Sequence, residues 1–141
     1  MLTNTRKIAI EWGDCDPLGI VFYPRYFAWF DACTAALFAH AGLPKHEMLK
    51  KYNILTLPLV STSAKFILPS KFGEEVTVES TVVEFRRSSF DVRHRVFNAG
   101  QLAIEASETR VWTGKDPENP NKFKGLPIPE EVTARFTGHP A

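Results

Sequence analysis

The sequence has little of several features that mark special classes of protein. Its two cysteines, Cys15 and Cys33, are too few for a disulfide framework and fit a reducing compartment. The net charge at pH 7 is only +1, so no excess of one sign indicates binding to nucleic acid or to a membrane surface. Residues 1–7 contain no apolar signal segment, and we therefore expect a cytoplasmic protein.

The length and composition are those of an ordinary globular domain. The chain has 141 residues, of which 44% are hydrophobic and 23% charged, which is enough for one substantial core. We predict a single domain over residues 1–141, in which residues 114–141 form a Pro-rich C-terminal tail. Residues 115–129 are expected to be mostly loop, residues 129–136 to make one or two helical turns, and the last few residues to be disordered.

One long apolar segment organises the chain. Between Arg25 and His40 only Asp31 and Thr34 interrupt a run of apolar and aromatic side chains. Pro24 suits the first turn of a helix, and Gly42 is placed to end one. A helix that is apolar on nearly every side is expected to be buried on every side, and this one is too short and too interrupted to span a bilayer.

The remaining apolar residues alternate with polar ones, which is typical of strands. In the fourth strand Phe90, Val92, His94 and Val96 share one face. The predicted strands cover residues 7–12, 55–68, 75–85, 90–97 and 101–113, and a short helix covers residues 45–52. Three successive long strands with short turns predict an antiparallel meander. The fold class is therefore α+β, with a curved five-stranded antiparallel sheet wrapped around one long central helix.

The turn before the long helix carries a specific motif. Residues 13–24 read G-D-C-D-P-L-G-I-V-F-Y-P. This run resembles the hot-dog-fold thioesterases, and most of all the 4-hydroxybenzoyl-CoA thioesterase family of the Pseudomonas type. Asp31, the Gly-Leu-Pro at residues 42–44 and the Arg-Arg-x-Ser-Phe at residues 86–90 support the resemblance. It covers about residues 7–113, and the Pro-rich tail departs from it.

The resemblance implies hydrolysis of an acyl-CoA without a metal or another cofactor. The catalytic carboxylate of the family falls on Asp16, and the backbone N–H that polarises the thioester carbonyl falls on Tyr23. Asp16 can act as a nucleophile or as a base that activates water, and both roles stay open. Gly19 would let the substrate approach the backbone closely. The structural alternative is that Asp14 and Asp16 only order the turn, and we assign that role to Asp14.

Other residues are candidates for binding the two ends of the substrate. The resemblance places the CoA phosphates at Arg86 and Arg87, with Ser88 beside them, although arginines are also common at solvated strand ends. The resemblance favours contact of Asp31 with the acyl group; its alternative is a buried hydrogen bond that joins helix and sheet. Three more residues complete the expected pocket: Tyr23, Phe27 and His46, the last standing where the Pseudomonas-type enzyme has tryptophan.

Several rival chemistries are weaker on the sequence. Cys15 as a nucleophile lacks a paired base, and Asp14, Cys15 and Asp16 are too close in sequence to form a metal site. His94 is interpreted as a hydrogen-bonded core histidine. A hot-dog dehydratase would need a histidine in the loop that enters the helix, and this loop has none. A thioesterase for short aliphatic acyl groups and a non-catalytic ligand carrier remain alternatives.

The sheet itself predicts self-association. A single five-stranded sheet leaves two open edges, and proteins avoid leaving such edges bare. We therefore expect a homo-oligomer, and the resemblance implies dimers that assemble into a tetramer. The expected partners are the acyl-CoA substrate and further copies of the chain, with no nucleic acid and no membrane.

Overall fold

A five-stranded antiparallel sheet dominates the structure, a computed structural model that describes residues 1–138. Its strands are β1 (Thr3–Ala9), β2 (Leu59–Phe66), β3 (Glu75–Phe85), β4 (Ser89–Asn98) and β5 (Gln101–Val111), in the spatial order β1-β3-β4-β5-β2. The meander of β3, β4 and β5 and the α+β class are confirmed. The expected disorder of the last few residues falls on residues 139–141, which lie outside the described part of the chain.

The first strand begins and ends earlier than the sequence predicted. Residues 7–12 alternate, but the ladder with β3 covers Thr3–Ala9. Beyond Ile10 the backbone turns into a short 3-10 helix at Trp12–Asp14, because the side chain of Asp14 accepts a hydrogen bond from the N–H of Glu11 at 2.9 Å. The polar edge residues 3–6 carry no apolar alternation, so the pattern missed them.

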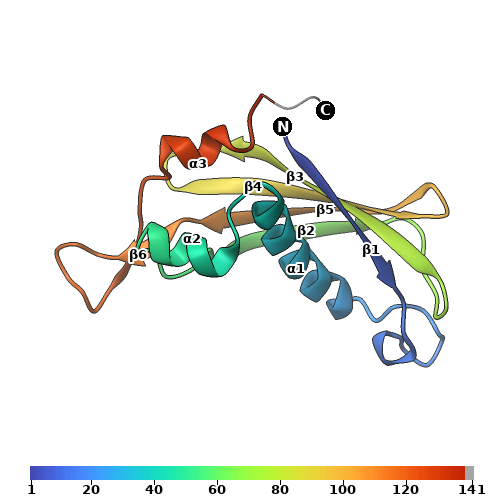
Figure 1. The fold of residues 1–141 in the computed structure, drawn as a ribbon. Helices are drawn as coiled ribbons and strands as arrows, with labels where there is room; N and C mark the ends of the chain where they lie inside the picture. The colour runs from blue at the N-terminus through green and yellow to red at the C-terminus, as the bar shows by residue number, and fades with distance from the viewer. Residues whose placement is uncertain (139–141) are drawn as a thin grey trace.

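The long helix α1 (Pro24–His40) lies across one face of the twisted sheet (Figure 1). Its sheet-facing side is buried and includes Phe30, Cys33 and Leu37. The expectation that it is buried on every side is wrong for the single chain, because Ala28, Asp31, Ala32 and Ala39 are exposed. Alanine counts as apolar in a sequence pattern, but its side chain has little apolar area, so leaving it exposed to water costs little free energy.

The connections and the tail follow the prediction except for one short strand pair. Helix α2 (Lys45–Lys51) follows α1 and confirms the predicted second helix. Strands β6 (Thr113–Lys115) and β7 (Phe123–Gly125) pair within the tail and project beyond the end of β5 (Figure 1). The prediction that residues 115–129 are mostly loop is confirmed, because residues 116–122 and 126–129 lie outside any helix or strand. Helix α3 (Glu130–Ala134) supplies the predicted last helical turns. Among residues 1–138, no helix is long and apolar enough to cross a bilayer.

The core between helix and sheet consists of two apolar clusters. One includes Phe38, Phe90 and Trp112, and the other includes Phe30 and Val78. On α1, on β3 and β4, and on β5 with its continuation to Trp112, a buried polar residue lies between the part of the element in one cluster and the part in the other. These residues are Thr34 on α1, Ser80 on β3, His94 on β4 and Glu108 on β5. The core therefore contains a polar layer whose side chains must find partners inside the protein.

Candidate active site

The turn that leads into α1 folds back on itself in a compact hairpin. The N–H of Asp16 donates to the carbonyl of Ile20 at 2.9 Å, and the backbones of Cys15 and Val21 pair in an isolated antiparallel β-bridge. Gly19 sits at the tip with φ of +79°, a conformation that favours glycine, and the space beside its Cα is open. The turn therefore presents its backbone to solvent next to the start of α1.

The carboxylate of Asp16 is fixed by one of its two oxygens. Oδ1 accepts a hydrogen bond from the N–H of Leu18 at 2.9 Å, which is a typical Asx turn. Oδ2 accepts no hydrogen bond from residues 1–138. Asp16 thus combines a structural role with a free oxygen, so the two roles weighed from the sequence do not exclude each other.

A backbone donor is left free where α1 begins. Tyr23 precedes the first residue of the helix, and Pro24 at that first position has no N–H. The next amide, the N–H of Arg25, already donates to the carbonyl of Phe22 at 2.9 Å. The N–H of Tyr23 has no acceptor within the described residues, and the helix macrodipole favours negative charge at this end.

Two cavities lie along α1. The first, of about 290 Å³, is lined by apolar residues at the helix start and at the end of β2, including Tyr23, Tyr26 and Phe66. The second, of about 270 Å³, surrounds Asp31 and is hereafter the Asp31 pocket. Tyr23 and Asp31 therefore line different cavities of one chain, and the single pocket predicted from the sequence does not form within it.

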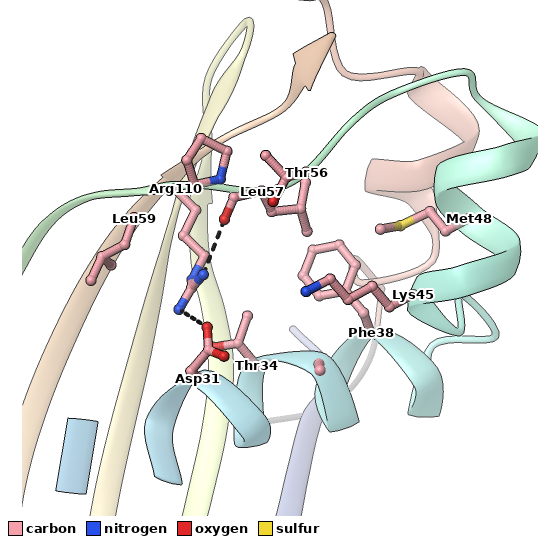
Figure 2. A pocket seen from close by; sticks show the side chains of 11 residues that line it. Asp31, Thr34, Phe38, Lys45, Met48, Thr56, Leu57, Leu59 and Arg110 are labelled. Atoms are coloured by element: carbon pink, nitrogen blue, oxygen red, sulfur yellow. Dashed lines mark hydrogen bonds and ion pairs between the residues drawn. The ribbon is translucent and has the colours of Figure 1, made fainter. Parts of the chain in front are cut away.

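The Asp31 pocket is bordered by α1, α2 and the loop before β2 (Figure 2). Asp31, Thr34 and Phe38 of α1 point into it from one side. Lys45 and Met48, three residues apart on α2, face it from another, and the loop residues Thr56, Leu57, Pro58 and Leu59 complete the wall.

Two residues expected at the pocket lie elsewhere. His46 is exposed and does not line the pocket, while its neighbour Lys45 does. Because successive residues of a helix point about 100° apart, a shift of one position exchanges the side chain that faces the pocket. Phe27 packs instead against the core, with its ring edge on Phe30 at a centroid distance of 6.0 Å.

Arg110 was not predicted as a site residue, yet it joins the Asp31 pocket to the polar layer. Its Nη2 donates to Oδ1 of Asp31 at 2.9 Å and to Oε2 of Glu108 at 3.0 Å. Its Nη1 donates to the carbonyl of Leu57 at 3.0 Å. A signal was present in the sequence, because a Glu-x-Arg spacing on a strand directs both charges to the same face of the sheet.

Glu108 is the charged centre of the polar layer. Its Oε1 accepts hydrogen bonds from Thr34 at 2.6 Å and from Arg110 at 3.1 Å, and Nε2 of His94 lies 3.1 Å from the same oxygen. Burial alone would raise the pKa of Glu108, but the hydrogen bonds from His94, Arg110 and Thr34 outweigh burial and lower the pKa to about 2. The carboxylate is therefore ionised at neutral pH.

The two arginines expected to bind phosphate are neighbours in the hairpin between β3 and β4, but their side chains differ in their partners. Arg86 donates to both oxygens of Asp91, at 3.0 and 2.7 Å, and also to Glu84 at 3.1 Å. The side chain of Arg87 is exposed and has no hydrogen-bond or ion-pair partner among residues 1–138. Ser88 is half-buried, and its hydroxyl lies against Gly125 of the tail. Of the three candidates, Arg87 is the one with a free charged group.

Comparison with known proteins places this arrangement among the thioesterases. A family model described as "Thioesterase-like superfamily" matches residues 10–136. The 4-hydroxybenzoyl-CoA thioesterase of Pseudomonas sp. (strain CBS-3) is 34% identical over 133 residues, which are 90% of this chain and 92% of that protein. A putative acyl-CoA thioesterase of Bacillus subtilis (strain 168) is 24% identical, with 88% of this chain and 89% of that protein covered.

Solved structures agree with the fold. The structure of the Pseudomonas enzyme superposes with a TM-score of 0.85 at 33% identity, covering 94% of this chain and 98% of that one. A gentisyl-coenzyme A thioesterase superposes with a TM-score of 0.80 at 27% identity, covering 96% of this chain and all of that one. The predicted hot-dog fold is confirmed, and the chain belongs to the Thioesterase-like superfamily.

Proposed function

We propose that this chain hydrolyses acyl-CoA thioesters at the start of α1. The observation that carries the proposal is the unpaired N–H of Tyr23, next to a turn that holds Asp16 with one carboxylate oxygen free. The thioester carbonyl oxygen would accept the hydrogen bond from Tyr23. Negative charge that develops on this oxygen is stabilised by the N–H and by the positive end of the helix dipole.

Asp16 has two chemically balanced routes. As a nucleophile, it would attack the carbonyl carbon, the C–S bond would break, and the CoA thiolate would leave; water would then hydrolyse the resulting mixed anhydride. As a general base, Asp16 would take a proton from the water that attacks the carbonyl directly; the C–S bond of the tetrahedral intermediate would then break, and the proton would pass to the departing CoA thiolate. Both routes end in a free acid and CoA, and both use the free Oδ2.

Pairing of two chains through β2 would complete the substrate site. The edge strand β2 exposes apolar side chains, among them Val60 at 60% and Phe66 at 50% exposure, whereas the other edge, β1, is mostly polar. In an antiparallel pairing of two β2 strands, the start of one lies beside the end of the other. Leu59 borders the Asp31 pocket and Phe66 borders the pocket at the helix start. The Asp31 pocket of one copy would then adjoin Asp16 and Tyr23 of the next.

The assembly prediction can be tested by light scattering at micromolar concentration. We expect a mass of at least twice the 15.9 kDa of one chain, and a dimer of dimers gives four times that mass. Val60→Lys should shift the mass towards the monomer and lower activity, because it buries a charge at the proposed interface. The control is Thr5→Lys on the exposed opposite edge, which should change neither. A parent chain of monomer mass would contradict this prediction.

We propose a hydroxylated aromatic acyl group as the preferred substrate. The Asp31 pocket has ample room for an aromatic ring, since a cavity of ~150 Å³ already holds benzene. Its walls combine apolar residues with Asp31, which can accept a hydrogen bond from a ring hydroxyl. The names of two similar proteins, 4-hydroxybenzoyl-CoA thioesterase and gentisyl-coenzyme A thioesterase, support this class.

A coupled thiol-release assay with 4-hydroxybenzoyl-, benzoyl- and butyryl-CoA tests the proposed function. We expect kcat/KM for the hydroxylated substrate to be ~10-fold or more above that for the others, because a polar group built to pair with a hydroxyl is left unpaired without it. A preference for butyryl-CoA would return Asp31 to a structural role and leave only the general thioesterase activity. No release from any acyl-CoA would refute the function.

Arg87 should bind the phosphates of CoA. A charge-assisted hydrogen bond is worth ~1.5–3 kcal/mol, so Arg87→Ala should raise KM for acyl-CoA by ~10- to 100-fold. Arg86→Ala should have the smaller effect, because Asp91 and Glu84 already occupy its guanidinium. An acyl-pantetheine without the nucleotide phosphates is the matched substrate control. Equal losses on both substrates would mean that Arg87 serves the structure instead.

A further inference from the structure

A chain of buried hydrogen bonds crosses the core and ends at the Asp31 pocket. The hydroxyl of Ser80 lies 2.7 Å from Nδ1 of His94, whose Nε2 lies 3.1 Å from Glu108. Glu108 binds Arg110, and Arg110 binds Asp31. Ser80, His94, Glu108 and Arg110 are buried, while the side chain of Asp31 is 64% exposed.

The guanidinium of Arg110 is fixed on three sides. Nε and Nη2 both donate to Glu108, and Nη1 donates to the carbonyl of Leu57 in the loop that borders the pocket. Only 8% of its side chain is exposed. The planar fork therefore has one orientation, and Nη2 is directed at Oδ1 of Asp31 (Figure 2).

Stability alone is a weak reason for this arrangement. Apolar clusters lie on both sides of the polar layer, and buried ion pairs can often be replaced by apolar side chains without loss of stability. Glu108 by itself already supplies the negative charge that Arg110 needs. The additional bond from Arg110 to an exposed carboxylate in a pocket has no comparable structural purpose.

We propose that Arg110, held by Glu108, is the positioning residue that orients the carboxylate of Asp31 for recognition of the acyl group. This inference rests on the proposed function. An exposed aspartate would otherwise exchange between rotamers, and ordering it during binding costs free energy. With Oδ1 held by Arg110, Oδ2 is the oxygen left to accept a hydrogen bond from a ring hydroxyl.

Arg110→Lys tests the proposal, because lysine keeps the charge but cannot reach Glu108, Leu57 and Asp31 with one ammonium in this geometry. The measured quantity is the ratio of kcat/KM for 4-hydroxybenzoyl-CoA to that for benzoyl-CoA. We expect Arg110→Lys to lower this ratio by about tenfold, the range expected for a lost charge-assisted hydrogen bond. Asp31→Ala should lower it as far, and the double variant no further.

The control is Arg95→Lys, on β4 but on the outer face of the sheet, where the arginine lies 3.9 Å from Glu105. The ratio of kcat/KM for 4-hydroxybenzoyl-CoA to that for benzoyl-CoA should be the same in Arg95→Lys as in the parent. An Arg110→Lys variant that loses activity equally on both substrates would overturn the proposal, since that is the signature of a purely structural residue.

A second variant, at exposed Asp31, covers the case in which Arg110→Lys does not fold. In Asp31→Asn, Arg110 should still bind the amide oxygen, which turns the NH2 group into the pocket. The preference should then move towards 4-methoxybenzoyl-CoA, whose ether oxygen only accepts hydrogen bonds. The measured quantity is the ratio of kcat/KM for 4-methoxybenzoyl-CoA to that for 4-hydroxybenzoyl-CoA, because a ring hydroxyl can also accept a hydrogen bond from this NH2. A ratio equal to that of the parent would overturn the proposal. If the parent hydrolyses acyl-CoAs without regard to the hydroxyl, this inference and the proposed substrate preference fail while the thioesterase activity stands. If it hydrolyses none, the proposed function fails and the inference with it.

Discussion

Asp16→Asn is expected to leave the fold intact and to lower the turnover of acyl-CoA by ~10²–10⁴-fold, or by more if Asp16 is the nucleophile. The amide oxygen of asparagine can still accept the hydrogen bond from the N–H of Leu18, which Asp16 now accepts at 2.9 Å. The turn should therefore keep its shape. What is lost is the charge on the second oxygen, and with it both the nucleophile and the base.

The matched control is Asp14→Asn in the same turn. The carboxylate of Asp14 accepts a hydrogen bond from the N–H of Glu11, and the amide oxygen of an asparagine at this position can accept the same bond. Activity should therefore change by less than ~10-fold. Circular dichroism and thermal unfolding should show that both variants are folded. A folded Asp16→Asn enzyme that turns over acyl-CoA at the parent rate would rule out the proposed mechanism.

The local sequence predicted the main helices and strands of the fold, although not the β6–β7 pair. The alternation of apolar residues predicted the inner faces of β3 and β4, and Pro24 and Gly42 predicted the ends of α1 to within two residues. The motif at residues 13–24 predicted the family. These features depend on neighbours within a few residues, which is the range over which propensity and periodicity act.

Long-range pairing could not be predicted in the same way. Asp31 was recognised as a carboxylate that needed a partner, but that partner, Arg110, is 79 positions away in the sequence. Its identity depends on which strand lies opposite α1, and therefore on the sheet order. Likewise, Lys45 rather than His46 faces the pocket because of the rotational phase of α2, which composition does not determine.

The predicted substrate pocket is divided between two cavities of one chain. The sequence suggested one pocket containing both Tyr23 and Asp31, but the two residues line separate cavities. Seven residues of α-helix, at a rise of ~1.5 Å each, separate Asp31 from the free backbone end of the helix. One substrate can contact both sites of the proposed function most simply when they come from different copies, which makes the edge of β2 part of the chemistry.

The buried carboxylate at the centre of the polar layer should have the largest effect on stability. Glu108→Gln is expected to lower the free energy of unfolding at pH 7 by ~3–5 kcal/mol, because Arg110 loses its buried counter-charge. The glutamine NH2 would also face donors of Arg110, Thr34 or His94, so at least one buried donor is left without an acceptor. Chemical denaturation at a fixed protein concentration measures the loss, since assembly would otherwise shift the apparent stability.

The pH dependence separates this charge effect from a packing defect. The pKa of Glu108 is lowered from 4.5 in the unfolded reference to about 2 in the folded protein. Its stabilising contribution is therefore fully present above about pH 4.5 and is lost as the pH falls towards 2. By linkage this contribution amounts to ~3 kcal/mol.

Between pH 5 and pH 2.5 the parent should lose stability more steeply than Glu108→Gln, so the two curves should converge in acid. Glu105→Gln, on the outer face of the same strand, should follow the parent curve to within ~1 kcal/mol. Parallel curves for the parent and Glu108→Gln would show that the side chain contributes through packing rather than through its charge, and Arg110 would then lack the fixed anion on which its control of Asp31 depends.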